Sequence, residues 1–146
     1  DAPSTITRLQ NMGTPDYLIS AATQLVVAQR LARKNCKDCK IPDEDVTPKV
    51  LQDLGFTAEA ASRVKAVKGK GCSKCSNTGY KGRQGIYEIL VVSKPIKEAI
   101  LRQATTPELR EIGIKEGFQT MQDMGRRLIA SGELNFREYE RVLSVD

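Results

Sequence analysis

The sequence predicts an α+β fold that is mostly helical and carries a small sheet beside a four-cysteine metal site. Three observations lead to this prediction. Apolar residues recur at helical spacing through much of residues 1–34 and 93–146. One apolar run, residues 86–92, is typical of a strand that is covered on both faces. The cysteines stand in two Cys-x-x-Cys pairs between these helical regions.

The N-terminal residues predict two helices. Pro3 suits the first turn of a helix, and Gly13 ends that helix. Between them, Ile6 and Leu9 share one face. A second, longer helix is expected over residues 17–34, because apolar residues recur there every three to four positions. This helix is expected to lead directly into the first cysteine pair.

The segment between the two cysteine pairs is predicted to form a small insert. Residues 41–45 make an acidic, proline-containing loop, and residues 64–67 are a candidate strand. Between these, Thr47 and Thr57 each cap a short helix. The glycines that follow the candidate strand are expected to let the backbone approach the metal ligands.

A glycine-rich stretch, residues 76–85, follows the second cysteine pair and leads into the strand predicted at residues 86–92. Glu88 interrupts this otherwise apolar strand, and Arg83 stands between two glycines just before it. Arg83 has two readings. It is a solvated charge or an ion-pair partner of Glu88, or it is a guanidinium held for a ligand or a neighbouring domain. The residues alone favour the first reading.

The last third of the chain predicts four short helices that would form a small bundle. Their expected starts are Ser93, Thr105, Thr120 and Asn135. Asn135 and Glu138 have the spacing of a capping box. No pattern in this part is typical of a catalytic site, so the helices are interpreted as structural.

The four cysteines predict a zinc site. They are Cys36, Cys39, Cys72 and Cys75, and the chain contains no other cysteine and no histidine. Two Cys-x-x-Cys turns can complete a closed tetrahedral site, which suits a structural rather than a catalytic zinc ion. Two alternatives stay open, namely a pair of disulfides and a redox-active Cys-x-x-Cys. Neither pair is predicted to lie between a strand and a helix N-terminus, as a thioredoxin-like site would.

Composition limits the class of protein. Aromatic residues make up 5% of the chain, so the core is expected to be mostly aliphatic. The longest apolar stretch, residues 18–28, contains polar residues and is too short to span a bilayer. Cysteine thiols that bind a metal ion must stay reduced, and the cytoplasm is a reducing compartment. The chain is therefore expected to be cytoplasmic and not itself transmembrane.

Basic residues cluster in sequence near the cysteines, and a basic zinc module can bind nucleic acid. These cations can instead offset the formal charge of about −2 on a zinc ion with four thiolate ligands. Stacking aromatics are almost missing, with Tyr80 alone close by, and this argues against binding to single strands. The residues concerned are Arg30, Arg33, Lys34, Lys37, Lys40, Lys65, Lys68, Lys70, Lys74, Lys81 and Arg83.

Several motifs together carry a family resemblance over essentially the whole chain. They are residues 1–9, residues 27–33, the two cysteine pairs, residues 78–88, residues 116–117 and residues 131–132. In this order they resemble the C-terminal part of the GspE/PilB-like secretion ATPases, which drive type II secretion and type IV pilus assembly. The resemblance implies that this family's Walker A, acidic box and Walker B lie upstream, so the chain is expected to be a fragment.

The resemblance implies that the parent protein is a hexameric, Mg²⁺-dependent ATPase of the RecA-like class. It would act on the cytoplasmic side of the bacterial inner membrane and convert ATP hydrolysis into assembly of a pilin-like filament. Its expected partners are neighbouring ATPase subunits and an inner-membrane platform or a membrane-anchored cytoplasmic component. Without Walker A and Walker B, this chain is expected to be inactive alone.

The resemblance also divides the chain into three parts. Residues 1–35 would be the end of the RecA-like core, residues 36–92 the zinc-binding subdomain with the following strand, and residues 93–146 a helical subdomain. The family's Gly-Arg-x-Gly segment lies near the nucleotide base, which makes Arg83 an expected nucleotide contact. The alternative function is a self-standing zinc module that binds nucleic acid or protein.

Overall fold

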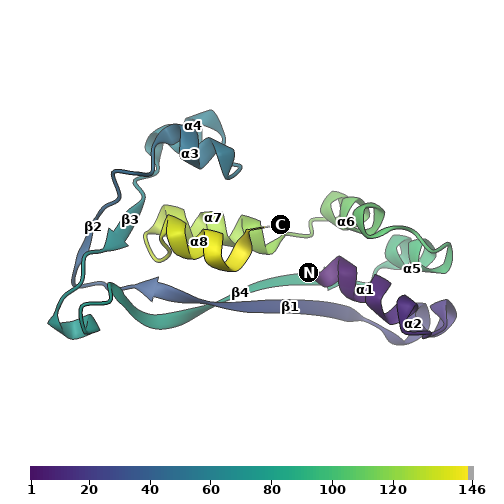
Figure 1. Cartoon of the computed structure of the whole chain (residues 1–146). Coiled ribbons are helices and arrows are strands. Elements are labelled where there is room, and N and C mark those ends of the chain that lie inside the picture. Colours follow the sequence, from purple (N-terminus) through teal and green to yellow (C-terminus); the bar gives the residue numbers. More distant parts are fainter. Residues whose placement is uncertain (145–146) are drawn as a thin grey trace. The chain divides into compact units, whose positions relative to one another are not determined.

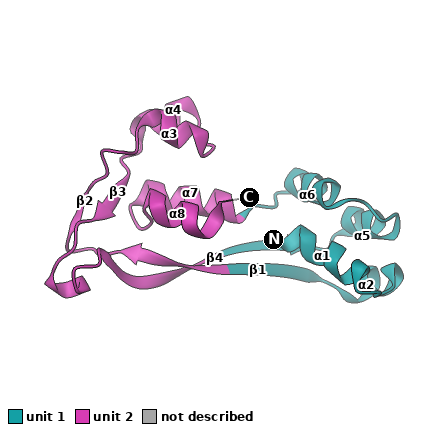
Figure 2. Ribbon diagram, in the orientation of Figure 1, with its two compact units in different colours: residues 1–29, 87–120 teal, residues 30–86, 121–146 magenta. Residues whose placement is uncertain are grey.

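A computed structural model describes residues 1–144 of the chain (Figure 1). Within these residues the fold is α+β, with eight α-helices and two two-stranded sheets. The chain forms two compact units (Figure 2): unit 1 contains residues 1–29 and 87–120, and unit 2 contains residues 30–86 and residue 121 onward. Residues 145–146, the end of the predicted helical subdomain, lie outside the described residues.

Four helices belong to unit 1. They are α1 (Ala2–Asn11), α2 (Asp16–Ala22), α5 (Lys94–Leu101) and α6 (Thr106–Lys115). Helix α1 packs on α6, and α2 packs on α5. Among the described residues, no helix has the length and apolar character that crossing a bilayer requires.

The core of unit 1 is aliphatic, as the composition predicts. It contains buried side chains from the helices and from two strands that begin or end in this unit. The buried residues are Ala2, Ile6, Ile19, Val26, Leu90, Val92, Ile96, Ala99, Ile100, Ala104 and Leu109. Burial of apolar surface of this kind is the main favourable term in folding.

Strand β1 (Leu25–Asn35) shows that the helix predicted over residues 17–34 is wrong in its second half. The helical part is α2, which ends at Ala22. The apolar positions of this region fit a period of two as well as a period of 3.6, and Val26 and Val27 favour extended backbone. Pairing with a strand far along the chain decides between the two.

Strand β4 (Tyr80–Val91) is the partner of β1. The strand predicted over residues 86–92 is confirmed, but it begins earlier, within the glycine-rich stretch. At one end Val92 N–H donates to the Gln24 carbonyl, and at the other Cys36 N–H donates to the Gly79 carbonyl, both at 2.9 Å. The two strands therefore run antiparallel.

Unit 2 contains a second, shorter strand pair. Strand β2 (Lys40–Pro42) overlaps the start of the stretch predicted as a loop, residues 41–45, and β3 (Val67–Gly69) begins at the end of the predicted strand. The pair is antiparallel, with Lys40 opposite Gly69. We call β2 and β3 the neck, because the chain between them, residues 43–66, leaves and returns through it. That excursion contains α3 (Pro48–Asp53) and α4 (Ala58–Arg63).

Unit 2 also contains α7 (Met121–Ser131) and α8 (Phe136–Leu143). The predicted caps are confirmed where a side chain accepts the backbone N–H three positions later. This holds for Thr47, Thr57, Thr105 and Asn135. Ser93 precedes α5 but makes no such bond, because its hydroxyl donates to the Glu116 carboxylate at 2.6 Å.

Candidate metal centre

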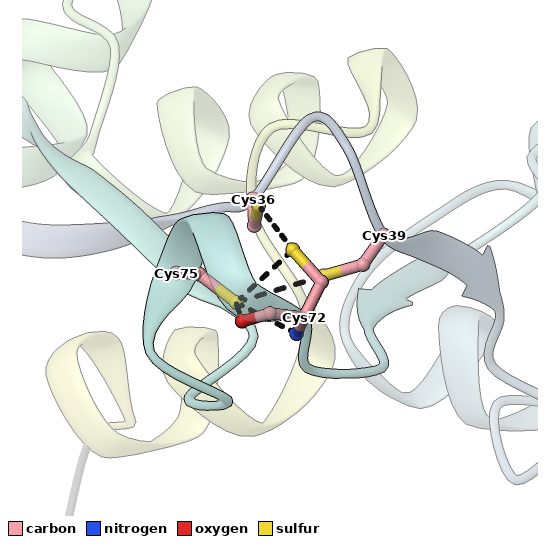
Figure 3. Close-up of side chains that lie close together, drawn as sticks. All are labelled: Cys36, Cys39, Cys72 and Cys75. Carbon is pink, nitrogen blue, oxygen red and sulfur yellow. Dashed lines mark hydrogen bonds between the residues drawn. The ribbon is translucent and has the colours of Figure 1, made fainter.

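The structure brings the four cysteine side chains together in unit 2. Figure 3 shows them converging from two turns of the chain. Their sulfur atoms all lie within 4.8 Å of one another. The Cys36–Cys72 and Cys39–Cys75 sulfur distances are 3.8 Å, and the Cys72–Cys75 distance is 3.7 Å. A tetrahedral zinc site with zinc–sulfur bonds of about 2.3 Å has sulfur–sulfur edges of about 3.8 Å. The cluster therefore has the size of a zinc site.

The sulfur distances do not fit the disulfide alternative. All four cysteines are free, and a disulfide would need sulfur atoms about 2.05 Å apart. The thioredoxin-like alternative also lacks its helix. The helical segment at the second pair is a single turn, η1 (Ser73–Cys75), which follows Cys72 and ends at Cys75. Four sulfur ligands around one centre suit a closed metal site better than either alternative.

Three elements position these cysteines. Cys36 directly follows β1, Cys39 directly precedes β2, and Cys72 directly precedes η1, of which Cys75 is the last residue. Backbone N–H groups point at two of the sulfurs. Gly71 N–H donates to Cys39 Sγ at 3.3 Å, and the N–H groups of Cys72 and Gly79 each donate to Cys75 Sγ at 3.2 Å. Such donors stabilise a thiolate more than a thiol.

Gly79 connects the two cysteine pairs. Its N–H binds the Cys75 sulfur, and its carbonyl accepts the Cys36 N–H. Its φ of +81° is a conformation that suits glycine. The chain at Gly69, the last residue of the neck, passes so close that a Cβ there would lie 2.0 Å from the Gly79 carbonyl oxygen. Both positions therefore require glycine. At Gly69 this agrees with the prediction that the backbone approaches the metal ligands there.

The protonation of the thiols reflects their crowding. Burial raises the pKa of the Cys75 thiol, but its N–H donors and sulfur neighbours outweigh burial and lower that pKa to about 6. The Gly71 N–H lowers the pKa of the Cys39 thiol, but desolvation and the other three cysteines raise it to about 11. Two negative charges about 4 Å apart repel each other by several kcal/mol near a protein surface. Four thiolates held this close would therefore need a cation, and a divalent metal ion would supply that charge.

The structure shows the surroundings of two basic residues near the cysteines, Lys74 and Arg83. Lys74 lies 3.7 Å from the Asp38 carboxylate, which pairs a cation with an anion beside the cysteines. Arg83 is exposed on β4. The Glu88 carboxylate, its suggested partner, is buried in unit 1 and accepts the Ala2 N–H at 2.5 Å. The Arg83 side chain is therefore exposed, and it is not among the hydrogen-bond donors to the cysteine sulfurs in the part of the chain that the structure describes.

A second charged cluster in unit 2 was not predicted as a cluster. Glu138 of α8 is fully buried, and its carboxylate accepts hydrogen bonds from Arg33 of β1 and from Arg141. The Arg141 Nε and Nη2 atoms lie 2.7 Å from its two oxygens, and the Arg33 Nη2 atom lies 2.9 Å away. The Arg33 guanidinium also stacks over Tyr80, 4.1 Å from the ring centroid.

These arginines control the protonation of Glu138. Burial raises the pKa of the Glu138 carboxyl, but the hydrogen bonds from Arg141 and Arg33 outweigh burial and lower the pKa to about 2. Half of the capping-box prediction is confirmed, because Asn135 Oδ1 accepts the Glu138 N–H at 2.7 Å. The Glu138 side chain binds the two arginines and ties β1 to α8. The local sequence offered no signal for the contact with Arg33, which is 105 residues away.

Known proteins that resemble the chain point to one family. The profile of the family described as "Type II/IV secretion system protein" matches residues 1–141. The type IV pilus assembly ATPase PilB of Myxococcus xanthus is 35% identical over 94% of this chain and 24% of its own length. PilB of Pseudomonas aeruginosa is 36% identical over 97% of this chain and 25% of its own length.

Similarity extends to the secretion branch. The type II secretion system ATPase E of Vibrio cholerae is 34% identical over 86% of this chain and 27% of its own length. The chain thus spans about a quarter of the length of these three relatives. The family profile covers almost every residue, from the first helix into α8. On this coverage, the chain belongs to the type II/IV secretion system protein family.

Proposed function

We propose that this chain is the zinc-binding part of a hexameric ATPase that powers pilus assembly or type II protein secretion. Relatives of both kinds resemble it, at 35% identity over 94% of the chain for a pilus assembly ATPase and 34% over 86% for a type II secretion ATPase, so the proposal covers both machines. The observation that carries the zinc role is the set of four sulfurs at tetrahedral spacing. A closed sulfur site leaves no open position for substrate or water, so the metal ion would have a structural role.

In this proposal the parent protein supplies the chemistry. ATP and Mg²⁺ would bind to segments outside this chain, and this chain alone would be inactive. Residues 1–35 would complete a RecA-like core, residues 36–92 would form the zinc subdomain, and residues 93–146 would form a helical subdomain. The expected neighbours are other ATPase subunits and a component of the inner-membrane platform, on the cytoplasmic side of that membrane.

Elemental analysis tests the zinc role directly. Protein purified without chelator is expected to carry about one zinc ion per chain, because the four cysteines make one closed site. Its thiols should react slowly with a thiol reagent until a chelator is added. A metal content far below one ion, together with four reactive thiols, would contradict the proposal. The double variant Cys36→Ser/Cys72→Ser serves as the metal-free control.

Arg83 remains a proposed nucleotide contact of the parent protein. Its exposure on β4 supports this role, because its guanidinium is available to a ligand bound by another part of the parent. In a longer protein that contains the phosphate-binding segment, Arg83→Ala is expected to weaken nucleotide binding about fivefold to tenfold, the size of one lost hydrogen bond. Isothermal titration measures the dissociation constant.

The control for Arg83 is Lys81→Ala, which removes another exposed positive charge from the same strand. This variant separates a specific contact from a general loss of positive charge near a phosphate group. Equal weakening by both variants would indicate general electrostatics, and an unaltered dissociation constant for Arg83→Ala would remove Arg83 from the site.

A further inference from the structure

Asn35 binds the turn that joins α7 to α8. It is the last residue of β1, is 2% exposed and directly precedes the candidate metal ligand Cys36. Its Nδ2 atom donates to the Gly132 carbonyl at 3.0 Å, and its backbone N–H donates to the Glu133 carbonyl at 2.9 Å. Its Oδ1 atom accepts a hydrogen bond from Asn135 Nδ2 at 3.3 Å. The residue before a sulfur ligand is therefore hydrogen-bonded to this turn through both its backbone and its side chain.

Asn135 extends these hydrogen bonds to the segment of the second cysteine pair. It is 5% exposed, and its Oδ1 atom caps α8 by accepting the Glu138 N–H. Its Nδ2 atom donates to Asn35 Oδ1 and, at 3.0 Å, to the hydroxyl oxygen of Tyr80. Tyr80 directly follows Gly79, whose N–H donates to a cysteine sulfur. One buried amide thus connects the start of α8 to the segments that carry both cysteine pairs.

These buried amides tie the position of the turn to the position of a metal ligand. A buried amide without a hydrogen-bond partner is costly. Among the described residues, no buried side-chain nitrogen or oxygen atom lacks a partner. If the α7–α8 turn, residues 132–135, moved away, the side chain and the backbone N–H of Asn35 would lose partners together. A displaced Asn35 would also move Cys36, because the two residues share a planar peptide unit.

We infer that Asn35 and Asn135 are positioning residues that couple zinc binding to the docking of the α7–α8 turn. With the turn docked, Cys36 is held where its sulfur can share a metal ion with the other three cysteines. A metal ion bound to Cys36 in turn keeps Asn35 in place for the turn. Such coupling is reciprocal, so the docked turn raises the zinc affinity by the same factor by which zinc favours the docked turn.

The substitution Asn135→Ser tests the coupling while it keeps the helix cap. The serine hydroxyl can still accept the N–H three positions later, but serine lacks the amide nitrogen that binds Asn35. Partners that orient a metal ligand contribute tenfold to a hundredfold to metal affinity, so we expect Asn135→Ser to weaken Zn²⁺ binding about tenfold. Competition between the purified chain and a chromophoric zinc chelator measures the dissociation constant. An unaltered dissociation constant would overturn the inference.

A double variant tests whether the two amides act as one unit. Asn35→Ala removes the other half of the pair and should weaken Zn²⁺ binding at least as much as Asn135→Ser. The double variant should bind Zn²⁺ little more weakly than Asn35→Ala alone, because the shared hydrogen bond is already lost. Losses that multiply would show two independent effects and overturn the coupling. If Asn35→Ala does not fold, Asn35→Ser takes its place.

Val142→Ala is the control for a general loss of stability. Val142 is buried on the same helix, and its side chain takes no part in the hydrogen bonds of the two amides. This variant should lower the Tm but leave the zinc dissociation constant unchanged. If it lowers the zinc affinity as much as Asn135→Ser does at a similar Tm, ordinary destabilisation explains the loss and the inference is wrong.

Hydrogen exchange measures the same coupling from the side of the helix. Zn²⁺ added to the metal-free chain should slow amide exchange in α8 by at least about tenfold, because the coupling is reciprocal. In Asn135→Ser this zinc-dependent protection should shrink by about the factor lost in zinc affinity. Protection that depends on zinc equally in both proteins would contradict the inference.

The inference rests on the proposed zinc role, but the two can fail separately. A metal content far below one ion per chain would contradict the proposed function, and the inference with it. About one zinc ion per chain, together with an unaltered zinc affinity and unaltered exchange in Asn135→Ser, would overturn the inference alone. The structural role proposed for the metal ion would then stand.

Discussion

Replacing Cys72 by serine is expected to unfold the part of unit 2 that contains the cysteines, the neck and the helical excursion. Zinc binding to structural sites of small domains contributes roughly 10–16 kcal/mol of apparent folding free energy. This is as large as the whole stability of a typical domain, roughly 5–15 kcal/mol. The neck is a pair of three-residue strands, and the excursion is also bonded to α7 through Arg126 Nη1, which donates to the Leu54 carbonyl at 3.0 Å. Limited proteolysis should show rapid cleavage within residues 36–75.

The helices of unit 1 should remain folded in this variant, because none of the four cysteines belongs to the core that these helices form among the described residues. Ser73→Ala is the control, since it changes an exposed residue between the same two cysteines without removing a ligand. A chelator should have the same effect on the unsubstituted protein and no further effect on Cys72→Ser. Unchanged protease resistance after complete metal removal would contradict the prediction.

Substituting Glu138 by alanine is expected to destabilise unit 2 by about 3 kcal/mol. The carboxylate is fully buried and binds two arginines that are about half exposed. Removing the acid leaves a cavity and takes away the partner of both arginines, which usually costs roughly 3–5 kcal/mol. The exposed guanidinium groups can regain water, so the lower end of that range applies. Urea denaturation measures the change, with Glu140→Ala as the exposed control on the same helix.

Glu138 also predicts how stability depends on pH. Its pKa is about 2 in the folded protein and 4.5 as the reference value. A lowered pKa stabilises the fold at every pH above the reference value, and this contribution disappears as the pH falls toward about 2. The free energy of unfolding should therefore decrease by about 3 kcal/mol between pH 5 and pH 2 from this group. Glu138→Gln should show a flatter pH dependence in that range, and an equally steep one would contradict the assignment.

The parts of the fold that were predicted are those whose signals are local. Thr47, Thr57 and Asn135 identify helix starts because the capping bond spans three residues. The four cysteines identify the candidate metal site because few other arrangements of two Cys-x-x-Cys pairs are chemically useful. The glycines beside them were also interpretable, since close backbone approach excludes a side chain.

The parts that were missed depend on contacts between distant residues. Residues 25–34 satisfy a helical and an extended pattern, and only pairing with β4 selects the strand. Arg33 and Glu138 are separated by 105 residues, so their ion pair is not visible in either local segment. The pairing of β2 with β3, in which Lys40 lies opposite Gly69, was missed for the same reason. A three-residue strand can be recognised only from its pairing partner.

The neck has a consequence for how such chains can diverge. The hydrogen bonds at its two ends, from Lys70 N–H to the Cys39 carbonyl and from Asp43 N–H to the Ala66 carbonyl, are both 2.9 Å. They close the excursion before it reaches the sulfurs. Lengthening a closed loop costs only about 0.6 kcal/mol per doubling. Insertions within residues 43–66 would therefore leave the positions of the four sulfur atoms unchanged. The length of this excursion can differ between homologues while the cysteine site stays the same.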